Sequence, residues 1–544
     1  MIEINDKKIY YPLKYKPTKI QIDALDFIKK SINNGKKFIL LNMPTGSGKS
    51  YLIAGMFANW YRNFITKDAK FDILTESKIL QDQYANDFDY ISIYKGKSNY
   101  YCNPYGCQCD IAKEQCKDKK PSCYNTTCPY DVARNKWINS SIGLTNFHLF
   151  NALSLYQKDI IDSRNSNVLI IDEAHLYEEN FSNYLSFNIS AKILKNCGFE
   201  SGEIIHLDDR YISKIKTVEN FIKFISEKLS NDLERKKIIF ESKVEHTKNK
   251  EKITLLGYIN RINHKLESIN HIMDSYKNDS ENIVLDLNID KFEKMYSGVE
   301  LNIQCIWINE YISDIWKKYD HVIFMSATIL EKNIFSFING IDENLTSYYD
   351  VPSPFDIKNR KIYYMKIGKM NYNSKTETFQ KMIPWINKIL EKYKDKKGII
   401  HTTNYEIAEW IKENIQNSRL LFHNNKDRNE ILERHLNTSD PTVLVSPSMM
   451  TGVDLANNLS RFQIILKVPY PNLSSNKIKN RQKSKPEYYT LKTLNDIIQA
   501  YGRSVRNIND YADTYILDEN FSDLLKYNSH MMPKYFIDAI KNLK

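Results

Sequence analysis

The sequence lacks any long hydrophobic run. Its longest apolar stretches, such as FILL and the start of VLIIDEA, are far too short to cross a lipid bilayer. The N-terminal stretch MIEINDKKIYYPLKYKPTK has no apolar segment of the kind that a secretory signal peptide needs. Internal repeats and low-complexity tracts are also absent. We therefore expect a soluble, cytoplasmic protein, whose 544 residues leave room for several domains.

Cysteine is scarce outside one short interval. Six of the eight cysteines lie between Cys102 and Cys128, in the lysine-rich stretch CNPYGCQCDIAKEQCKDKKPSCYNTTC. Disulfides are rare in a reducing cytosol, so clustered cysteines there more often bind metal. Four thiolates suit either a [4Fe–4S] cluster or a zinc ion. Residue chemistry alone leaves both open.

Acidic residues are outnumbered by basic ones. The 77 Lys and Arg residues against 66 Asp and Glu give a formal net charge of +11 and a pI near 8.9. Such a balance suits a polyanionic partner such as nucleic acid. A general bias toward Lys, Asn and Ile explains it equally well.

Short β-branched runs alternate with polar helical stretches, which is typical of parallel α/β sheets. The first sheet is predicted to contain strands at 37–42, 71–77, 167–172 and 321–328. From about Lys358 the alternation restarts, and a second sheet is predicted with strands at 398–403, 442–447 and 462–469. The fold class is therefore α/β, with two parallel-sheet domains.

A long insertion between the third and fourth strands has helical periodicity instead. Apolar residues repeat every three or four positions in two stripes, at 218–229 and at 255–273. The polar segment 241–251 is predicted to turn the chain between them. We expect a charged helical hairpin inserted into the first α/β domain.

The stretch MPTGSGKS follows a predicted strand and precedes a predicted helix, which is the context of a phosphate-binding loop. Its glycines allow the backbone amides to approach a triphosphate, its lysine holds the β- and γ-phosphates, and its last serine ligates Mg²⁺. Met43 replaces the first glycine of the strict pattern. The candidate nucleotide-binding residues are Pro44, Thr45, Gly46, Ser47, Gly48, Lys49 and Ser50.

Two further motifs support a nucleoside triphosphatase. In IIDEAH, Asp172 ends a buried strand where it can hold the Mg²⁺ shell, and Glu173 can polarise the attacking water. In QAYGRSVR, Arg503 and Arg506 are three residues apart and are predicted to share a helix face. Facing a γ-phosphate, they would act as arginine fingers.

These motifs, in this order, resemble those of superfamily 2 helicases, and the cysteine cluster is similar to that of the XPD/DinG iron–sulfur branch. YKPTKIQ resembles the adenine-reading Q motif, LTESKILQDQY resembles motif Ia, and MSAT resembles motif III. SPSMMTGVDL resembles motif V and contains Thr451, Gly452 and Asp454. The resemblance adds Gln21, Gly452, Asp454 and Gln499 to the nucleotide-binding candidates.

The resemblance also implies a domain plan, because the cysteines and the helical hairpin occupy the family's cluster and arch positions. It places two RecA-like motor domains around an iron–sulfur insertion and a helical arch. The expected divisions are motor domain 1 at 1–97, 136–185 and 301–350, the cluster domain at 98–135, the arch at 186–300, and motor domain 2 at 351–544.

For the cluster, the resemblance points to Cys102 after SNYY and to Cys128 before a Pro-Tyr pair. Cys123 and Cys116 complete the expected ligand set, with Cys107 and Cys109 as alternates or spare thiols. Zinc remains the alternative to iron and sulfide.

The function implied is that of a monomeric ATP- and Mg²⁺-dependent DNA helicase with a [4Fe–4S] cluster. It would move 5′ to 3′ on single-stranded DNA and open forked or flapped duplexes, in repair or replication. The expected DNA contacts are Thr145, Asn146, Thr402, Thr403 and Thr451. Two alternatives stay open: an ATPase that remodels protein–DNA complexes without separating strands, and a binding subunit of a larger assembly whose ATPase acts as a switch.

Overall fold

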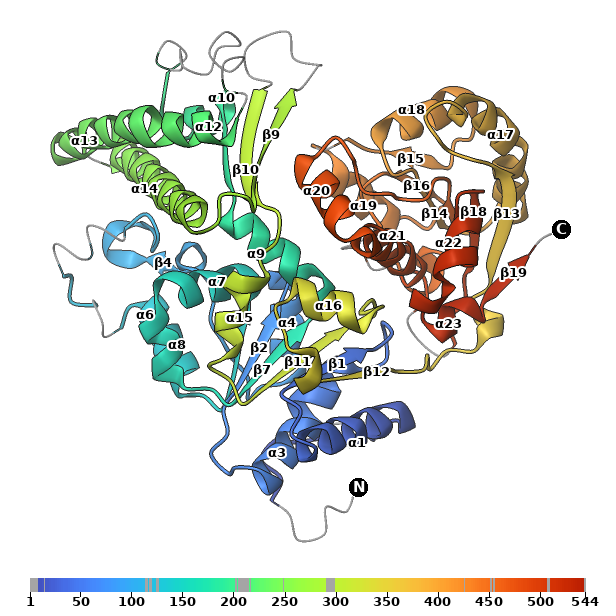
Figure 1. Ribbon diagram of the computed structural model, residues 1–544, viewed down its shortest axis with the longest axis horizontal. Coiled ribbons are helices and arrows are strands. Elements are labelled where there is room, and N and C mark those ends of the chain that lie inside the picture. The colour runs from blue at the N-terminus through green and yellow to red at the C-terminus, as the bar shows by residue number, and fades with distance from the viewer. Residues whose placement is uncertain are drawn as a thin grey trace.

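The protein forms two α/β lobes that lie side by side, with a helical insertion above the first lobe (Figure 1). This computed structural model describes residues 8–13, 15–112, 116, 120–123, 127–200, 203, 215, 217–247, 249–289, 299–424, 426–450, 453, 455–505 and 509–542. In those residues no helix is both long enough and apolar enough to cross a membrane.

The first lobe is built on a parallel sheet that confirms the four strands predicted for it. Within the described residues this sheet has seven strands in the order β12-β1-β11-β7-β2-β6-β3. Side chains alternate between its faces, so Phe38 and Leu40 enter one apolar core while Ile39 and Leu41 enter the other. The strands are β1 (Phe38–Asn42), β2 (Phe71–Thr75), β3 (Ser92–Ile93), β6 (Ile142–Asn146), β7 (Val168–Asp172), β11 (His321–Ser326) and β12 (Thr346–Asp350).

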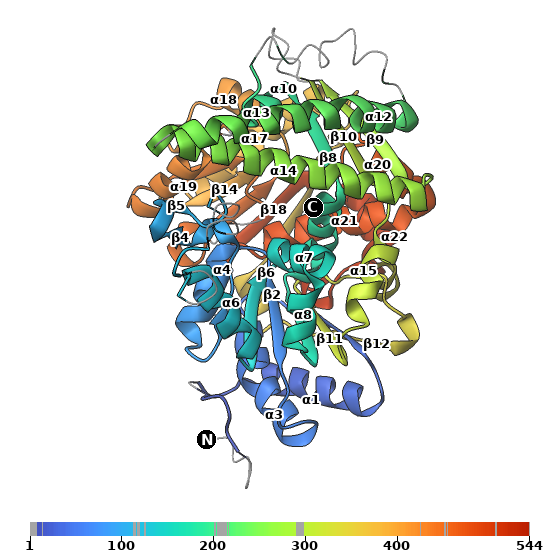
Figure 2. The ribbon, with the colours of Figure 1, turned by 90° about the vertical axis from the view of Figure 1, so that its left-hand side faces the viewer.

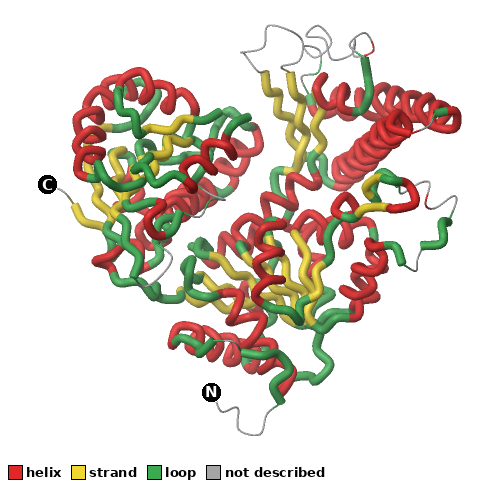
Figure 3. Tube along the Cα trace, turned by 180° about the vertical axis from the view of Figure 1, so that it is seen from behind, coloured by secondary structure: helices red, strands yellow, loops and turns green. Residues whose placement is uncertain are grey.

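Helices cover both faces of this sheet, as Figure 3 shows from behind. Burial on both faces explains why the strands are continuous apolar runs. The helix after β1 contains a π-helical segment, Leu52–Phe57, between α2 and α3. The helices are α1 (Lys19–Asn33), α2 (Lys49–Tyr51), α3 (Ala58–Phe64), α4 (Lys78–Asp87), α6 (Pro129–Asn139), α7 (Phe147–Tyr156), α8 (Lys158–Arg164), α9 (Tyr177–Leu185), α15 (Asn309–Trp316) and α16 (Lys332–Ile338).

The predicted helical insertion is confirmed, and it also contains a small antiparallel sheet that was not predicted. The sheet order is β8-β10-β9, formed by Phe187–Ser190, Val299–Cys305 and Ile283–Ile289. Beside it lie α10 (Ala191–Asn196), α12 (Val218–Phe224), α13 (Ser230–His246) and α14 (Asn249–Asn278), with the long pair α13 and α14 side by side (Figures 1 and 2). The predicted turn at 241–251 is wrong in extent, because α13 continues through His246 and α14 begins at Asn249.

The cysteine-rich stretch lies between β3 and α6. It begins with a short hairpin of β4 (Tyr101–Cys102) and β5 (Cys107–Gln108), in which Cys102 and Cys107 are direct cross-strand partners. Three of its thiol-bearing residues, Cys102, Cys107 and Cys109, belong to the apolar core of the first lobe. The stretch is therefore anchored to the motor fold at its N-terminal end.

The second lobe repeats the parallel α/β plan and confirms the three strands predicted for it. Its described strands form a seven-stranded sheet in the order β15-β16-β14-β17-β18-β13-β19. The strands are β13 (Ile362–Gly368), β14 (Gly398–His401), β15 (Leu420–Phe422), β16 (Val443–Ser446), β17 (Phe462–Ile465), β18 (Asp513–Asp518) and β19 (Ile540–Asn542). The helices are α17 (Lys375–Lys392), α18 (Tyr405–Asn414), α19 (Arg428–Asn437), α20 (Asn476–Ser484), α21 (Pro486–Tyr501), α22 (Phe521–Asn528) and α23 (Lys534–Ile537). The fold is that of two RecA-like domains.

Candidate active site

The phosphate-binding loop connects β1 to α2 as its sequence predicts. Gly46 and Gly48 have φ of +75° and +81°, in the left-handed region that glycine adopts without strain. A Cβ at Gly48 would lie 2.2 Å from the Gln21 side-chain amide, so a larger residue would displace Gln21 as well as strain the backbone. Lys49 is buried, with its Nζ 3.6 Å from Glu173 Oε1. The two glycines thus allow the backbone conformation of the loop, and Lys49 lies next to the acidic motif.

Gln21 is hydrogen-bonded at both ends of its side-chain amide, at one end to this loop and at the other to the start of α1. Its Nε2 donates to the Gly48 carbonyl (3.1 Å), and its Oε1 accepts from the Thr18 backbone amide (2.9 Å). The second bond belongs to a capping box at the start of α1. The structure therefore places Gln21 beside the phosphate loop.

The acidic motif lies at the carboxyl end of β7. Asp172 is buried, and its two oxygens accept from the Glu173 amide (3.0 Å) and from the Tyr84 hydroxyl (3.1 Å). Burial raises the pKa of Asp172 to about 6, against the opposing effect of the Lys49 ammonium. Glu173 has a φ of +52°, an uncommon conformation for a side-chain-bearing residue, of the kind found at functional sites.

The residues present fit Mg²⁺. The Ser50 hydroxyl and the Asp172 carboxylate line one cavity of about 350 Å³, together with Gln83, Tyr84 and other residues of α4. Hydroxyl and carboxylate oxygens are the ligands that this hard cation prefers. The cavity leaves room for the water molecules that Mg²⁺ usually keeps.

A chain of hydrogen bonds connects the acidic motif to the second lobe. His175 Nδ1 is 2.7 Å from the Ser326 hydroxyl, which is 3.3 Å from that of Thr328. Gln499 Nε2, from the second lobe, donates to Thr328 Oγ1 (3.0 Å), and Arg503 Nη2 donates to Gln499 Oε1 (3.2 Å). Burial lowers the pKa of His175 to about 4, so its ring is neutral near pH 7. Sequence reasoning assigned no role to His175, Ser326 or Thr328, although IIDEAH and MSAT contain them.

Arg503 faces the cleft, but the prediction that it lies on a helix is wrong. The helix α21 ends at Tyr501, and Gly502 follows as its C-cap. The Arg503 guanidinium also donates to the Met450 and Val453 carbonyls, at 2.9 and 3.0 Å. Its positive charge offsets part of the rise that burial causes in the pKa of Glu76, a residue of the first lobe. Arg506, Thr451, Gly452 and Asp454 lie outside the described residues, so their predicted roles stay predictions.

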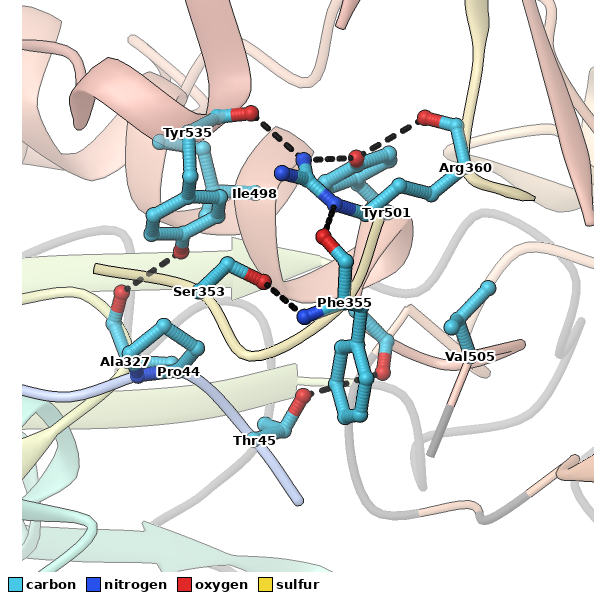
Figure 4. Close-up of a pocket in the computed structure, with 11 residues that line it drawn as sticks. Pro44, Thr45, Ala327, Ser353, Phe355, Arg360, Ile498, Tyr501, Val505 and Tyr535 are labelled. Atoms are coloured by element: carbon cyan, nitrogen blue, oxygen red, sulfur yellow. Dashed lines mark hydrogen bonds between the residues drawn. The ribbon is translucent and has the colours of Figure 1, made fainter. Parts of the chain in front are cut away.

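A small cavity of about 30 Å³ lies where the linker between the lobes passes the phosphate loop (Figure 4). Thr45 Oγ1 donates to the Gly502 carbonyl (3.3 Å), which joins the loop to the end of α21. The buried Arg360 anchors the linker by donating to the Phe355 carbonyl (3.0 Å) and to the Tyr501 hydroxyl (2.9 Å) (Figure 4). The two lobes therefore meet directly at the candidate ATP site.

A buried ion pair forms a second junction between the lobes. Arg481 of α20 pairs with Glu178 of α9 through both guanidinium Nη atoms, and both side chains are almost completely buried. Burial raises the pKa of Glu178, but Arg481 and Lys477 more than offset this, so the pKa lies below its usual value. Because α9 follows the acidic motif, this pair connects that motif to α20.

Some of the predicted DNA contacts are buried, and others are partly exposed. The hydroxyls of Thr145 and Thr402 are buried and donate to the carbonyls of Tyr94 and Asn404, both at 3.1 Å. Asn146 is partly exposed and caps α7 by accepting from the Leu149 amide (2.9 Å). Thr403 is partly exposed, with a φ of +64°. A DNA track through these positions stays a prediction.

The clustered thiols interact with one another. Cys102 Sγ is 4.0 Å from Cys116 Sγ, and the Cys109 thiol lies near that of Cys128. Burial and the neighbouring thiols raise the pKa of Cys109 and of Cys116 to about 12. Burial and the neighbouring Cys128 and Cys102 thiols also raise the pKa of Cys123.

Cys109 therefore lies near three of the four predicted ligands, Cys102, Cys116 and Cys128. Cys107 interacts with a single thiol, that of Cys102. Thiols are the donors that an iron–sulfur cluster and a zinc ion require, so the donor chemistry fits either. In the part of the chain that the structure describes, no three His, Cys, Asp or Glu side chains are placed to hold one metal ion together.

Two family models match the chain in the order of these motifs. Residues 14–197 match the model described as the res subunit of type III restriction enzymes, and residues 386–538 match the helicase C-terminal domain. A Methanocaldococcus jannaschii protein named as a probable ATP-dependent helicase is 22% identical, over 95% of this chain and 93% of its own length. The ATP-dependent DNA helicase CHL1 of Vanderwaltozyma polyspora is 21% identical, over 73% of this chain and 56% of its own.

Solved structures show the same fold. That of an XPD helicase aligns over 97% of this chain and 100% of its own, with a TM-score of 0.65 at 17% identity. Xpd4 of S. tokodaii covers the same shares, with a TM-score of 0.56 at 14% identity. The chain is an ATP-dependent helicase with the fold of the solved XPD helicases. ATP and Mg²⁺ follow from the likeness to ATP-dependent helicases.

Proposed function

We propose that the protein is a DNA helicase that moves along single-stranded DNA by hydrolysing ATP. Duplex DNA is separated at a gate formed by the cysteine-rich stretch and the helical insertion. Movement runs 5′ to 3′, and the substrates are forked or flapped duplexes. The protein acts as a monomeric motor in DNA repair or replication.

The observation that supports this most strongly is the hydrogen-bond chain from His175 to Arg503. It connects the acidic motif of one lobe to the arginine of the other through Ser326, Thr328 and Gln499. A change at the γ-phosphate would alter how the two lobes meet. Cycles of closing and reopening are what a translocating motor requires.

Each residue of the cleft has a chemical role in this proposal. Lys49 neutralises charge on the β- and γ-phosphates, and Ser50 and Asp172 hold Mg²⁺, which polarises those phosphates when bound. Glu173 orients the attacking water and accepts its proton. Arg503, together with Arg506, stabilises the charge that develops in the transition state.

For the gate, we propose that Cys102, Cys116, Cys123 and Cys128 hold a [4Fe–4S] cluster. The support is the shared neighbourhood of these thiols and the likeness to XPD helicases. The cluster supplies a rigid cross-link between segments of a short insertion, whose folding depends on it. Cys109 lies close enough to these thiols to compete for a place among the ligands.

A second candidate function is an ATPase that remodels protein–DNA complexes without separating strands, and the complete set of ATP-site residues supports it equally. ATP hydrolysis and strand displacement, measured together on forked duplexes with either a 5′ or a 3′ single-stranded tail, separate the candidates. We expect displacement of the labelled strand from the 5′-tailed duplex in the presence of ATP and Mg²⁺. DNA-stimulated hydrolysis without displacement from either duplex would support the remodelling function and contradict ours.

A further inference from the structure

Tyr84 is a buried tyrosine of α4 whose hydroxyl contacts both residues of the Mg²⁺ site. It is 2% exposed, and its Oη lies 3.1 Å from Asp172 Oδ2. The Ser50 hydroxyl lines the same cavity and acts on the pKa of Tyr84 as a hydrogen-bond donor, against the larger effect of burial. Tyr84 is the last residue of LTESKILQDQY, but the resemblance of that stretch to motif Ia gives this residue no role.

The direction of these two bonds follows from valence. An ionised Asp172 carboxylate only accepts, so Tyr84 must use its single proton to donate to it. The Tyr84 oxygen then accepts from the Ser50 hydroxyl. A serine that ligates a cation uses an oxygen lone pair and must place its proton elsewhere. Tyr84 is the acceptor for that proton, and the relay Ser50 to Tyr84 to Asp172 leaves the serine lone pairs available to the metal.

The same relay orients the carboxylate. One Asp172 oxygen accepts from Tyr84, and the other accepts from the Glu173 backbone amide at 3.0 Å. With one donor on each oxygen, rotation of the carboxylate breaks a bond on either side. Tyr84 itself is fixed by the helix and by its ring contact with Phe88, with centroids 6.0 Å apart. The cavity shared by Ser50, Tyr84 and Asp172 gives the cation a place beside this relay.

We propose that Tyr84 is a positioning residue for Mg²⁺. Its hydroxyl connects the Ser50 hydroxyl to the Asp172 carboxylate and fixes the orientation of both groups before ATP·Mg²⁺ binds. Partners that orient metal ligands in this way typically contribute 10- to 100-fold to metal affinity. Mg²⁺ demands nearly ideal octahedral geometry, so it depends on such positioning more than a tolerant cation does. The inference rests on the ATP site of the proposed function and is independent of strand separation.

The test measures binding of a fluorescent, non-hydrolysable ATP analogue with Mg²⁺, with Mn²⁺ and with EDTA. For Tyr84→Phe, which keeps the ring, we expect the Mg²⁺-dependent gain in affinity to fall roughly 10-fold or more. The loss should be smaller with Mn²⁺, and affinity in EDTA should be unchanged. The last measurement also reports that the variant is folded.

Tyr319→Phe is the matched control. Tyr319 is also buried, and its hydroxyl also donates to a buried aspartate, Asp72 Oδ2, at 3.1 Å. Asp72 lies near the start of β2, whereas Asp172 ends β7. The control removes the same kind of bond from the same lobe and should leave all three affinities unchanged.

Tyr84→Leu distinguishes the hydroxyl from the ring. If the hydroxyl matters, the Phe and Leu variants show the same Mg²⁺-specific loss. The proposal is overturned if Tyr84→Phe binds the Mg²⁺–nucleotide complex like wild type, or if it weakens binding equally with Mg²⁺, Mn²⁺ and EDTA. A wild-type protein that binds the analogue without any Mg²⁺ dependence would instead contradict the ATP site itself.

Discussion

Lys49 is the residue on which nucleotide chemistry depends most directly. Its buried ammonium lies 3.6 Å from Glu173 Oε1 and forms an ion pair with this carboxylate in the absence of nucleotide. Lys49→Ala should lower the rate of ATP hydrolysis at least 100-fold, the scale of losing one electrostatic stabiliser of a transition state. Single-stranded DNA binding should persist, because the proposed DNA contacts do not include this side chain.

Lys36→Ala serves as the control for this variant. Lys36 precedes the same strand, but its ammonium donates to the Asn344 carbonyl at 2.6 Å, away from the loop. Its removal should leave hydrolysis unchanged. Hydrolysis at the wild-type rate by the Lys49 variant would remove the phosphate-loop assignment.

Asp172 predicts a specific pH dependence. Its carboxylate must be ionised to hold Mg²⁺, and burial raises its pKa to about 6 from the ordinary value of 3.8. As pH falls through 6 the carboxyl gains a proton, so kcat/KM at limiting Mg²⁺ should fall on the acid side. Mg²⁺ competes with that proton, and a higher Mg²⁺ concentration should therefore move the midpoint to lower pH. An acid limb that stays in place at every Mg²⁺ concentration would contradict this.

Among the elements, α20 of the second lobe is held by the first lobe and by the insertion. Arg481 pairs with Glu178 of α9 and donates to the Ile306 carbonyl (2.6 Å), and Ser475, the N-cap of α20, donates to Asp286 of β9 (2.9 Å). The helix α20 leads directly into α21, which carries Gln499. This is a physical connection between the insertion and the ATP cleft.

Arg481→Met should therefore destabilise the protein strongly. The change leaves the Glu178 charge buried without its main partner, which costs about 3–5 kcal/mol in comparable cases. The measurements are the apparent Tm, which should fall, and the rate of proteolysis at the lobe junction, which should rise. Adding Glu178→Gln should restore part of the loss, because it removes the unpaired charge.

Lys381→Met is the control for the ion pair. Lys381 pairs with Glu377 on the surface of α17, where the two side chains are 57% and 74% exposed. Loss of such an exposed pair should cost less than about 1 kcal/mol. Equal effects of the two substitutions on Tm would show that the buried ion pair of α20 stabilises the protein no more than an exposed pair does.

The cysteine-rich stretch gives a prediction about individual thiols. Cys107→Ser should keep the wild-type iron and acid-labile sulfide, because this thiol interacts with Cys102 alone among the cysteines. Cys128→Ser should lose both. The measurement is metal and sulfide analysis of anaerobically purified protein. If Cys109→Ser loses its iron while Cys123→Ser keeps it, Cys109 replaces Cys123 in the ligand set, and zinc in the wild type would overturn the cluster.

The helices, strands and loops that the sequence predicts correctly are those with a local sequence signal. Four strands of the first sheet and three of the second could be predicted, because their faces are buried and their residues form continuous apolar runs. The loop around Lys49 was found because glycine spacing and a preceding strand are local signals. Arg503 was placed on a helix because its spacing from Arg506 fits one, but Gly502 ends that helix.

Contacts between distant segments could not be predicted. Tyr84 and Asp172 are 88 residues apart, and Arg481 and Glu178 are 303 apart, with no motif that connects them. The sheet of the insertion was missed because its strands are separated by long helices and pair only in the folded state. Such contacts depend on the whole fold, so single-sequence patterns do not contain them.

In the whole molecule, the cysteine-rich stretch and the helical insertion are built on the first lobe, apart from the cleft (Figures 1 and 2). Apolar clusters cover both faces of each sheet, and one cluster of the first lobe continues into the cysteine-rich stretch and the helical insertion. Loss of the metal site should therefore unfold the short insertion locally and leave the cleft able to hydrolyse ATP. In the function proposed above, ATP hydrolysis in the cleft drives strand separation at a separate gate.

The most direct test measures ATP hydrolysis and strand displacement on the same Cys128→Ser protein, with a 5′-tailed forked duplex as substrate. We predict that DNA-stimulated hydrolysis survives at least in part while displacement of the labelled strand is lost. Displacement at the wild-type rate by this variant, with its metal and sulfide gone, would contradict the account.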